Sequence, residues 1–417
     1  MTGVQILQPL SDVPPASSSL LATPQASRRR GSDPDRGAAR SFGPRRRTRR
    51  LLRWWGVLVL VLAVGTGGCG GPAAPTAALR EAGTPLSTGA RPTGLAVHED
   101  LLVVVHDDGS IVQITADGDV DLLTERSDRL SAPLVAFGAV WVVQTGAGGD
   151  TEPEAIDGTV EYRLDAVVRI DPLDGTAVAT IGDLGDQLLL VATDDAVWVV
   201  GERSGDRGWV WRIDPVTNRA TAVQEGDGVR GDSSVTTSVL VVAGGRLWLA
   251  GNCEAMPCPA GAARVRILEP ATGELTTLDV ELPDELMVSA AALVDGRLWF
   301  AGFPLGQLLG DNGSGRIVAV EATGEVSDQV EVGRFPTGLT FADDGLWLSD
   351  CLDGTITRID VADGTTLQGP LAVGTAYPPD EPFDWYREDF SCPGAMAEVG
   401  DTVWVALQLD GAVVPVR

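Results

Sequence analysis

The sequence contains no lysine and only two histidines, His98 and His106, among its 417 residues. All other basic side chains are therefore arginines, and the formal net charge is −27. The first 53 residues hold 11 arginines against three aspartates, so the remainder is more acidic than the chain as a whole. Such a surface repels nucleic acid, which is not expected as a partner, and attracts divalent cations or basic partners. Most acidic turns in exported β-proteins are nevertheless plain solvated surface.

Several catalytic signatures are also missing. The sequence has no P-loop, no glycine-rich dinucleotide fingerprint and no serine-hydrolase nucleophile elbow. Its five cysteines are not spaced with histidines as in a zinc site, so a metal bound by cysteine is not expected. Hydrophobic residues make up 44% of the chain, a composition that excludes global disorder and allows a large core.

What the sequence does contain is a repeated unit, whose clearest copy spans residues 335–365. Short apolar stretches in this copy are separated by turns such as Asp343-Asp344-Gly345 and Leu352-Asp353-Gly354. Residues 337–341, 346–349 and 355–360 have the pattern of short β-strands, and a fourth strand follows. Four antiparallel strands repeated every 40 to 45 residues or so are typical of a β-propeller blade.

A tryptophan on the second strand marks most copies of the unit. It recurs as Trp141, Trp198, Trp248, Trp299, Trp347 and Trp404, and Leu102 takes its place in the first copy. Seven copies predict an all-β fold, a seven-bladed β-propeller of four-stranded blades. The regular position of these tryptophans indicates that they form the core between blades rather than a binding surface.

The repeated motifs resemble those of a known group. Pro336-Thr337-Gly338-Leu339, then Gly345-Leu346-Trp347 and Arg358-Ile359-Asp360, are similar to blades of the YVTN, NHL and streptogramin-lyase-type propellers. The resemblance covers roughly residues 77–417 and implies the propeller fold. It says little about activity, because propellers serve in binding, as scaffolds and in catalysis.

The last copy ends after its third strand, at Arg417. Residues 77–89 precede Arg91-Pro92-Thr93-Gly94 in the way that a fourth strand precedes the next blade elsewhere in the chain. We therefore expect this N-terminal strand to complete the seventh blade and close the ring, which removes two exposed sheet edges.

The region before the repeats has the composition of an export signal. Residues 1–53 predict a disordered, basic, cytoplasmic segment, and residues 54–68 a signal-peptide core and cleavage region. The apolar run of 13 residues, 54–66, is shorter than the roughly 20 that a membrane-spanning helix needs. Cys69 follows small residues, as at a bacterial lipoprotein cleavage site, and residues 69–76 would form a flexible tether. We predict a location on the extracytoplasmic face of the cell membrane, lipid-anchored through Cys69 or held by an uncleaved signal anchor.

The four other cysteines predict two disulfides. Cys253 and Cys258 flank a four-residue loop, while Cys351 follows a second strand and Cys392 precedes a first strand. Loops in these two positions emerge on the same face of a propeller, so Cys351 and Cys392 can meet. We expect Cys253–Cys258 and Cys351–Cys392 bonds, which suit an oxidising compartment.

The candidate site lies on the face that carries the longest and most variable loops, because loops on a rigid scaffold are where function collects. We predict that ligand-binding residues gather there. They are His106, Glu202, Asn252, Asp350, Trp385 and Tyr386.

Two functions are consistent with this face. The first is a tethered, non-catalytic module that binds a protein or small ligand, with Trp385 and Tyr386 as interface anchors, and acts as a monomer. The alternative is a metal-dependent lyase or lactonase of the streptogramin-lyase or gluconolactonase type. The lyase pattern would need histidine bases in the late blades, which have none, whereas Glu202, Asn252 and Asp350 offer oxygen ligands for Ca²⁺ or Mg²⁺. We expect no resident cofactor unless one of these ions binds.

Overall fold

The computed structural model describes residues 80–417, except for 127, 146–164, 204–206, 227–234, 254–263, 279, 281, 283–285, 305–312, 322, 363, 380, 382–386 and 388. Every regular element within the described residues is a β-strand. No helix in this part of the chain has the length and hydropathy required to cross a membrane.

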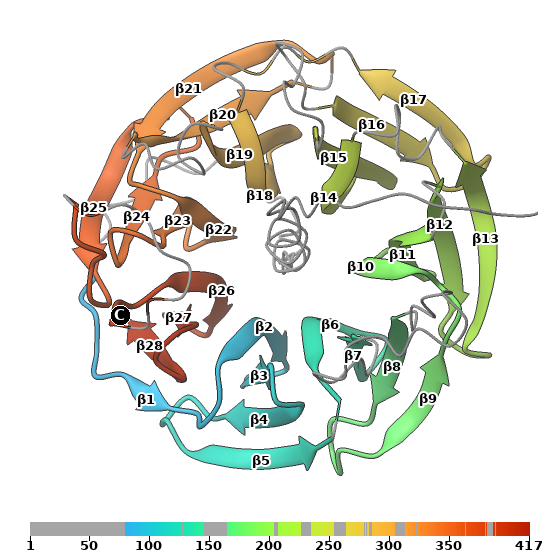
Figure 1. Cartoon of the computed structure of the whole chain (residues 1–417), viewed down its shortest axis with the longest axis horizontal. Helices are drawn as coiled ribbons and strands as arrows, with labels where there is room; N and C mark the ends of the chain where they lie inside the picture. The colour runs from blue at the N-terminus through green and yellow to red at the C-terminus, as the bar shows by residue number, and fades with distance from the viewer. Residues whose placement is uncertain are drawn as a thin grey trace, which may run out of the picture. The chain divides into compact units, whose positions relative to one another are not determined.

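The strands form seven four-stranded antiparallel sheets arranged as blades around a central axis (Figure 1). This confirms the predicted seven-bladed β-propeller. In chain order, the strands of blades 1 to 4 are β2 Pro92–His98, β3 Leu101–His106, β4 Ser110–Ile114, β5 Val120–Glu125; β6 Leu130–Ala136, β7 Ala139–Gln144, β8 Ala166–Ile170, β9 Ala177–Ile181; β10 Asp186–Ala192, β11 Val197–Arg203, β12 Arg207–Asp214, β13 Arg219–Gly226; β14 Val235–Ala243, β15 Arg246–Cys253, β16 Arg264–Glu269 and β17 Glu274–Leu278. Those of blades 5 to 7 are β18 Leu286–Val294, β19 Arg297–Pro304, β20 Gly315–Val320, β21 Val326–Val332; β22 Pro336–Ala342, β23 Gly345–Asp350, β24 Thr355–Ile359, β25 Thr366–Ala372; β26 Pro393–Val399, β27 Thr402–Leu407, β28 Ala412–Val416 and β1 Leu86–Ser87.

The first strand of each blade lines the central axis and the fourth lies at the rim (Figure 1). Since neighbouring strands run antiparallel, the connections after second and fourth strands emerge at one end of the ring. We call this end the loop face, and the opposite end, closed by the turns after first and third strands, the turn face. On the turn face the first hairpins are tight, as at Ala342↔Gly345 and Val399↔Thr402.

The N-terminal strand closes the ring, as predicted. In β1, Leu86 pairs with Val413 and Ser87 with Ala412 of β28. The pairing continues before β1, because Glu81 and Arg417 exchange both backbone hydrogen bonds and the Gly83 N–H donates to the Pro415 carbonyl. The seventh blade therefore joins the two ends of the described chain, and β28 is covered by the N-terminal segment instead of being an outer edge.

Each tryptophan of the second strands is buried against the next blade. Trp347 packs with Val403 and Val405 of blade 7, and Trp141 packs with Val197 and Val199 of blade 3. Strand alternation places the residues on either side of each tryptophan against the preceding blade, so every interface buries apolar side chains from both blades. The tryptophans form the core between blades, as the repeat pattern indicated.

The alignment of the first blade is corrected by one residue. Counted from the hairpin that joins the first and second strands, Trp347 is the third residue of β23 and pairs with Thr340. The third residue of β3, counted in the same way, is Val103, which pairs with Ala96. Val103 also packs against the next blade, in a cluster with Val140, whereas Leu102 faces the preceding blade. Val103, not Leu102, is thus the equivalent of the tryptophans, and a run of five large apolar residues gave no marker to reveal the shift.

Third-strand arginines stack on the tryptophans. Register places Arg169 opposite Trp141 and Arg358 opposite Trp347, with the guanidinium carbons 5.1 and 5.9 Å from the ring centroids. Arg169 also donates to the backbone carbonyl of Pro215 in the following blade. The Arg-Ile-Asp motif therefore has a structural role: the arginine covers the indole and bonds the adjacent turn.

Hydroxyl groups at β-bulges join successive first strands. Register shifts occur between Pro92 and Gly94 and between Pro336 and Gly338, which leaves Thr93 and Thr337 unpaired in the ladder. Thr93 Oγ1 donates to the Leu130 carbonyl at 3.0 Å, and Thr337 Oγ1 to the Pro393 carbonyl at 2.5 Å. Ser289 donates to the Pro336 carbonyl in the same way. A bulge with a hydroxyl thus bonds each of these blades to its successor.

Candidate functional site

A compact apolar cluster lies outside the blade cores, on the loop face of blades 5 to 7. We call it the loop-face cluster, and its buried members are Phe303, Phe335, Cys351, Leu352, Tyr377, Phe390 and Cys392. The rings of Phe303 and Phe335 stack with centroids 4.2 Å apart, and Tyr377 meets Phe390 edge to face at 5.1 Å. These residues come from the end of β19 and from three connections, β21–β22, β23–β24 and β25–β26, so the cluster fixes the loops of three blades relative to one another.

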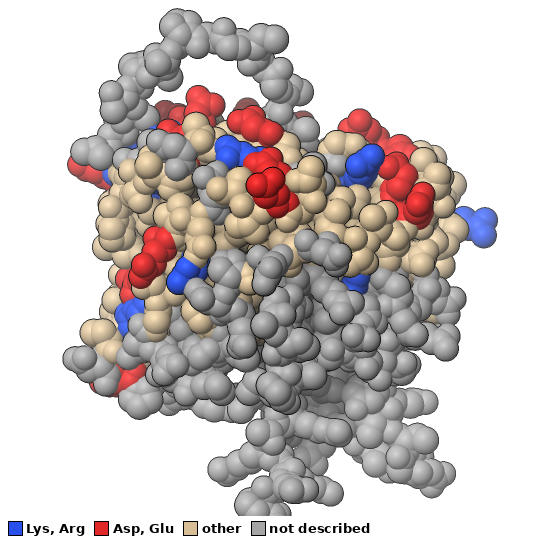
Figure 2. Space-filling view, turned by 90° about the horizontal axis from the view of Figure 1, so that it is seen from above, with Lys and Arg blue, Asp and Glu red and all other residues tan. Residues whose placement is uncertain are grey.

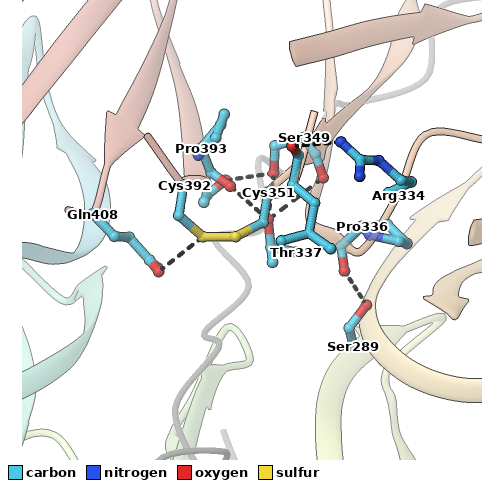
Figure 3. The surroundings of a disulfide bond; sticks show 11 residues. Ser289, Arg334, Pro336, Thr337, Ser349, Cys351, Cys392, Pro393 and Gln408 are labelled. Carbon is cyan, nitrogen blue, oxygen red and sulfur yellow. Dashed lines mark hydrogen bonds between the residues drawn. A yellow bond between two sulfur atoms is a disulfide. The ribbon is translucent and has the colours of Figure 1, made fainter. Parts of the chain in front are cut away.

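The predicted disulfide between Cys351 and Cys392 lies within this cluster (Figure 3). It joins the loop after β23 to the segment that precedes β26, across 41 residues of sequence. Beside it, Thr337 Oγ1 donates to the Pro393 carbonyl (Figure 3), and Ser349 Oγ donates to the Gly394 carbonyl at 2.9 Å. Gln408, from the loop after β27, contacts Cys392 Sγ at 3.7 Å. The bond therefore ties blades 6 and 7 together at the loop face.

Arg334 connects the same loops through an ion pair and hydrogen bonds. Its Nε donates to Asp353 Oδ1 at 2.6 Å, its backbone N–H donates to Asp353 Oδ2 at 2.7 Å, and its Nη2 donates to the carbonyls of Leu352 and Tyr377. The side chain of Arg334 is 14% exposed and that of Asp353 29%, so the pair is partly shielded from solvent. Charge-assisted hydrogen bonds of this kind are among the stronger ones in proteins.

Asp350, the last residue of β23, is buried just below this pair. Its side chain is 1% exposed, and among the described residues no side chain and no well-aligned donor bonds either carboxylate oxygen, the Gly333 N–H being a neighbouring backbone donor. Burial first, and the negative charge of Asp353 second, raise the pKa of Asp350 well above its usual value, while the nearby Gly333 N–H lowers it less. A buried carboxylate without side-chain partners costs stability, which marks the position as one that packing alone does not explain.

Gly333 provides the space in which the two carboxylates approach each other. A Cβ built on Gly333 would lie 2.7 Å from Oδ2 of both Asp350 and Asp353, closer than real side chains allow. Thr355, directly opposite Asp350 in the ladder, has a buried hydroxyl that also lacks a partner in the described chain. Oxygen atoms from three residues therefore converge between β23, β24 and the segment after β21.

His106 occupies the same register position in blade 1 as Asp350 does in blade 6. His106 pairs with Pro92 as Asp350 pairs with Pro336, and the residues that follow, Asp107 and Cys351, make equivalent backbone hydrogen bonds. The imidazole is fully buried, and its nitrogens contact Thr88 Oγ1 and both oxygens of Ser110. Burial is the main effect and lowers the pKa of His106, so the ring is neutral near neutral pH.

The other predicted site residues are only partly accounted for. Glu202 pairs with Asp186, and Asn252 with Thr236, at the loop-face ends of their hairpins, but their side chains lie outside the described residues. Trp385, Tyr386, Cys258 and Cys69 lie outside the described residues altogether, and the Cys253–Cys258 bond therefore stays a prediction. The sequence did not single out Gly333, Arg334, Asp353 or Thr355, although the turn Leu352-Asp353-Gly354 was recognised as a turn.

The two histidines do not form a common site. His98 ends β2 beside the turn face, whereas His106 ends β3 beside the loop face, at opposite ends of one hairpin. Within the described residues, no group of three or more histidine, cysteine or acidic side chains is placed to hold a metal. His98 and His106 therefore do not meet as a pair of bases.

The described surface is predominantly acidic. Figure 2 shows aspartates and glutamates spread over it, with arginines between them. Some of these acids are structural, since Asp108 accepts hydrogen bonds from Ser110, and Asp174 from Thr176. These aspartates thus stabilise turns, as the sequence indicated for acidic turn residues.

No protein-family profile and no curated protein sequence matches this chain. The fold, in contrast, is shared with many solved structures. The chain is similar to the WD40 β-propeller domain of Doa1, with a TM-score of 0.55 and 12% identity over 81% of this chain and 97% of that one. BamB from Moraxella catarrhalis has a TM-score of 0.44 and 12% identity, over 78% of this chain and 83% of that one. The computationally designed protein Ika8 has a TM-score of 0.46 and 15% identity, over 79% and 96%. At such low identity, the similarity shows a β-propeller fold and gives no information about function.

Proposed function

We propose that this protein is a membrane-tethered, extracytoplasmic binding module that recognises a protein or small ligand through its loop face. The observation that carries the proposal is the loop-face cluster, in which Phe303, Phe335 and Tyr377 are packed together outside the blade cores. A propeller does not need such a cluster for stability, because its blades already bury their own apolar faces. Fixing the loops in advance reduces the entropy lost on binding, which is what a recognition surface gains from such packing.

The two faces of the ring differ in the way that this function requires. The turn face consists of tight hairpins such as Ala342↔Gly345, whereas the loop face is built up over blades 5 to 7 by the Cys351–Cys392 bond and the Arg334–Asp353 pair. The blade motifs that resemble YVTN, NHL and streptogramin-lyase-type propellers are consistent with such a module. The disulfide supports an oxidising compartment.

Site-specific photo-crosslinking in the producing cell tests the binding face. A photoreactive residue replaces Asp108, Thr375, Asp389 or Asp410 on the loop face, or Asp100, Asp194, Asp295 or Asp344 on the turn face; all eight positions are exposed. We expect a discrete crosslinked species from loop-face positions only. Equal yields from both faces, or species from the turn face alone, would contradict the proposed binding face.

The tether is tested separately through Cys69. Cys69→Ser prevents attachment of lipid, so the variant should lose incorporation of a labelled fatty acid and keep the mass of its uncleaved precursor. If the variant stays membrane-bound and the wild type incorporates no label, the chain is held by a signal anchor. If neither form reaches the membrane fraction, the membrane tether of the proposal is wrong.

A further inference from the structure

Only one of the two carboxylates at the loop-face end of blade 6 is paired with an arginine in the described chain. Asp353 is neutralised by Arg334, whose Nε and backbone N–H both donate to it. Asp350, beside it, is 1% exposed and has no side-chain partner in the described chain. Arg334 bonds Asp353 and not Asp350 in the described chain, so an ionised Asp350 is a buried negative charge without compensation.

We propose that Asp350, Asp353 and Thr355 supply ligands to a small divalent cation, for which Ca²⁺ is the best fit. The three residues belong to β23, the loop after it and the start of β24, and Thr355 pairs directly with Asp350 in the ladder. Paired residues of neighbouring strands project from the same side of a sheet, so the Thr355 hydroxyl lies on the side of the Asp350 carboxylate. This inference goes beyond the proposed binding function and does not depend on it.

Gly333 is the second observation that points to a ligand here. An added Cβ would lie 2.6 Å from the Asp350 Cγ and 2.7 Å from Oδ2 of both aspartates, so both Oδ2 atoms face the same side of Gly333. The Gly333 carbonyl accepts a hydrogen bond from the Gly315 N–H at 2.8 Å, which fixes this backbone segment beside the two carboxylates. The absence of a side chain lets both carboxylates pack directly against the Gly333 backbone.

The chemistry of the donors selects the ion. Two carboxylates and a hydroxyl are hard oxygen ligands, which favour Ca²⁺ or Mg²⁺ over transition metals. The donors come from irregular backbone as well as from strands, and Ca²⁺ accepts six to eight such ligands, water included, in flexible geometry. Mg²⁺ demands a near-ideal octahedron and holds its own water, so it suits this set less well.

A bound cation would reduce the mobility of the loops on the loop face of blade 6. Asp353 is held by Arg334, which also bonds the carbonyls of Leu352 and Tyr377 in the loop-face cluster. A cation that joins Asp350 to Asp353 would connect the end of β23 to this network. The site thus lies beneath the surface that we propose for recognition and would fix its geometry without contacting the partner.

Thermal unfolding of the full-length chain in detergent tests the proposal. The protein is stripped with a chelator and unfolded in Ca²⁺, Mg²⁺ or Na⁺ at constant ionic strength. The variants are Asp350→Asn, Thr355→Val and, as a matched control of equal charge change in the same blade, Asp344→Asn, which is exposed on the turn face. At a Ca²⁺ concentration 100 times the dissociation constant, we expect the midpoint to rise by about 5 °C in wild type and Asp344→Asn.

The rise of the unfolding midpoint with Ca²⁺ should be absent in Asp350→Asn and smaller in Thr355→Val than in wild type. Without cation, Asp350→Asn should unfold at a higher temperature than wild type, because the amide does not carry a buried charge. A wild-type midpoint unaffected by Ca²⁺, or equal shifts in wild type and Asp350→Asn, would overturn the proposal, and an equal shift in Na⁺ would overturn the divalent assignment. If Asp350→Asn does not fold, equilibrium dialysis with radioactive Ca²⁺ decides: wild type and Asp344→Asn should each retain one ion per chain, and Thr355→Val should bind it more weakly.

Discussion

His106 and Thr88 meet where the ring closes, with His106 Nε2 2.9 Å from Thr88 Oγ1. Thr88 follows the strand that completes blade 7, and its hydroxyl also lies 3.3 Å from the Gly411 carbonyl, to which it can donate. On the other side of the imidazole, His106 Nδ1 contacts the carbonyl and hydroxyl oxygens of Ser110. A residue predicted as a ligand-binding candidate thus links the first blade to the last, and this contact accounts for its burial.

The burial of His106 predicts a pH dependence of stability. Because its pKa is lower in the folded state than the usual value near 6.5, the unfolded chain takes up a proton first as the pH falls. The stability associated with the neutral ring is complete above about pH 6.5 and decreases as the pH falls toward the folded-state pKa. Urea unfolding of wild type and His106→Gln between pH 8 and 5 should show a free-energy difference that narrows with acidification. A difference that stays constant over this range would contradict the argument.

Removal of residues 77–89 should destabilise the whole ring. It deletes β1 and the buried Arg80, which bonds the carbonyls of Asp401 and Val416 and pairs with Asp343 at 2.9 Å. We expect a lower unfolding midpoint in thermal scans, with Arg80→Ala alone costing about 1–3 kcal/mol. Replacing residues 70–76 by a Gly-Ser segment of equal length is the control and should change nothing. An unchanged midpoint in the deletion would show that blade 7 does not need its N-terminal strand.

Loss of the Cys351–Cys392 bond should lower stability through the unfolded state. With the two cysteines 41 positions apart in the sequence, the loop-closure account gives about 4 kcal/mol. The double variant Cys351→Ser/Cys392→Ser should therefore unfold at markedly lower denaturant concentration, and reductant should bring wild type close to it. Peptide mapping of the unreduced protein checks the bond directly and also tests Cys253–Cys258. Recovery of free thiols at both Cys351 and Cys392 would contradict this pairing.

Gly333→Ala should be costly although alanine is small. The added methyl would be forced against the carboxylates of Asp350 and Asp353, which have no room to retreat because one is buried and the other is held by Arg334. We expect a loss of about 1–3 kcal/mol in the free energy of unfolding. Gly182→Ala is the matched control, since its Cβ would meet nothing within 4 Å and it lies in an equivalent connection between blades. Equal effects of the two substitutions would mean that the space at Gly333 has no special role.

Much of the candidate site was beyond prediction from sequence. Asp350 was named because it follows a tryptophan strand, but Asp353 and Gly333 belong to turns whose composition is ordinary for a propeller. Their convergence depends on the segment after β21 crossing over the end of β23, a contact between blades that no local pattern encodes. The sequence alignment took Leu102 instead of Val103 as the equivalent of the tryptophans, so the position of His106 within its blade was shifted by one residue. The run Leu101-Leu102-Val103-Val104-Val105 aligns equally well in both ways.

The sequence by itself determined the number of blades, their four antiparallel strands, the closing N-terminal strand and the Cys351–Cys392 pair. These follow from turn residues, alternation and repeat length, which act over a few residues and recur often enough to be recognised. Tertiary structure alone decided that Asp350 is buried without a side-chain partner in the described chain, that Thr88 contacts His106 and that Arg334 neutralises Asp353. Such pairings depend on how one blade packs against the next, and the energy of a buried charge is set by surroundings that the chain assembles only when the ring closes.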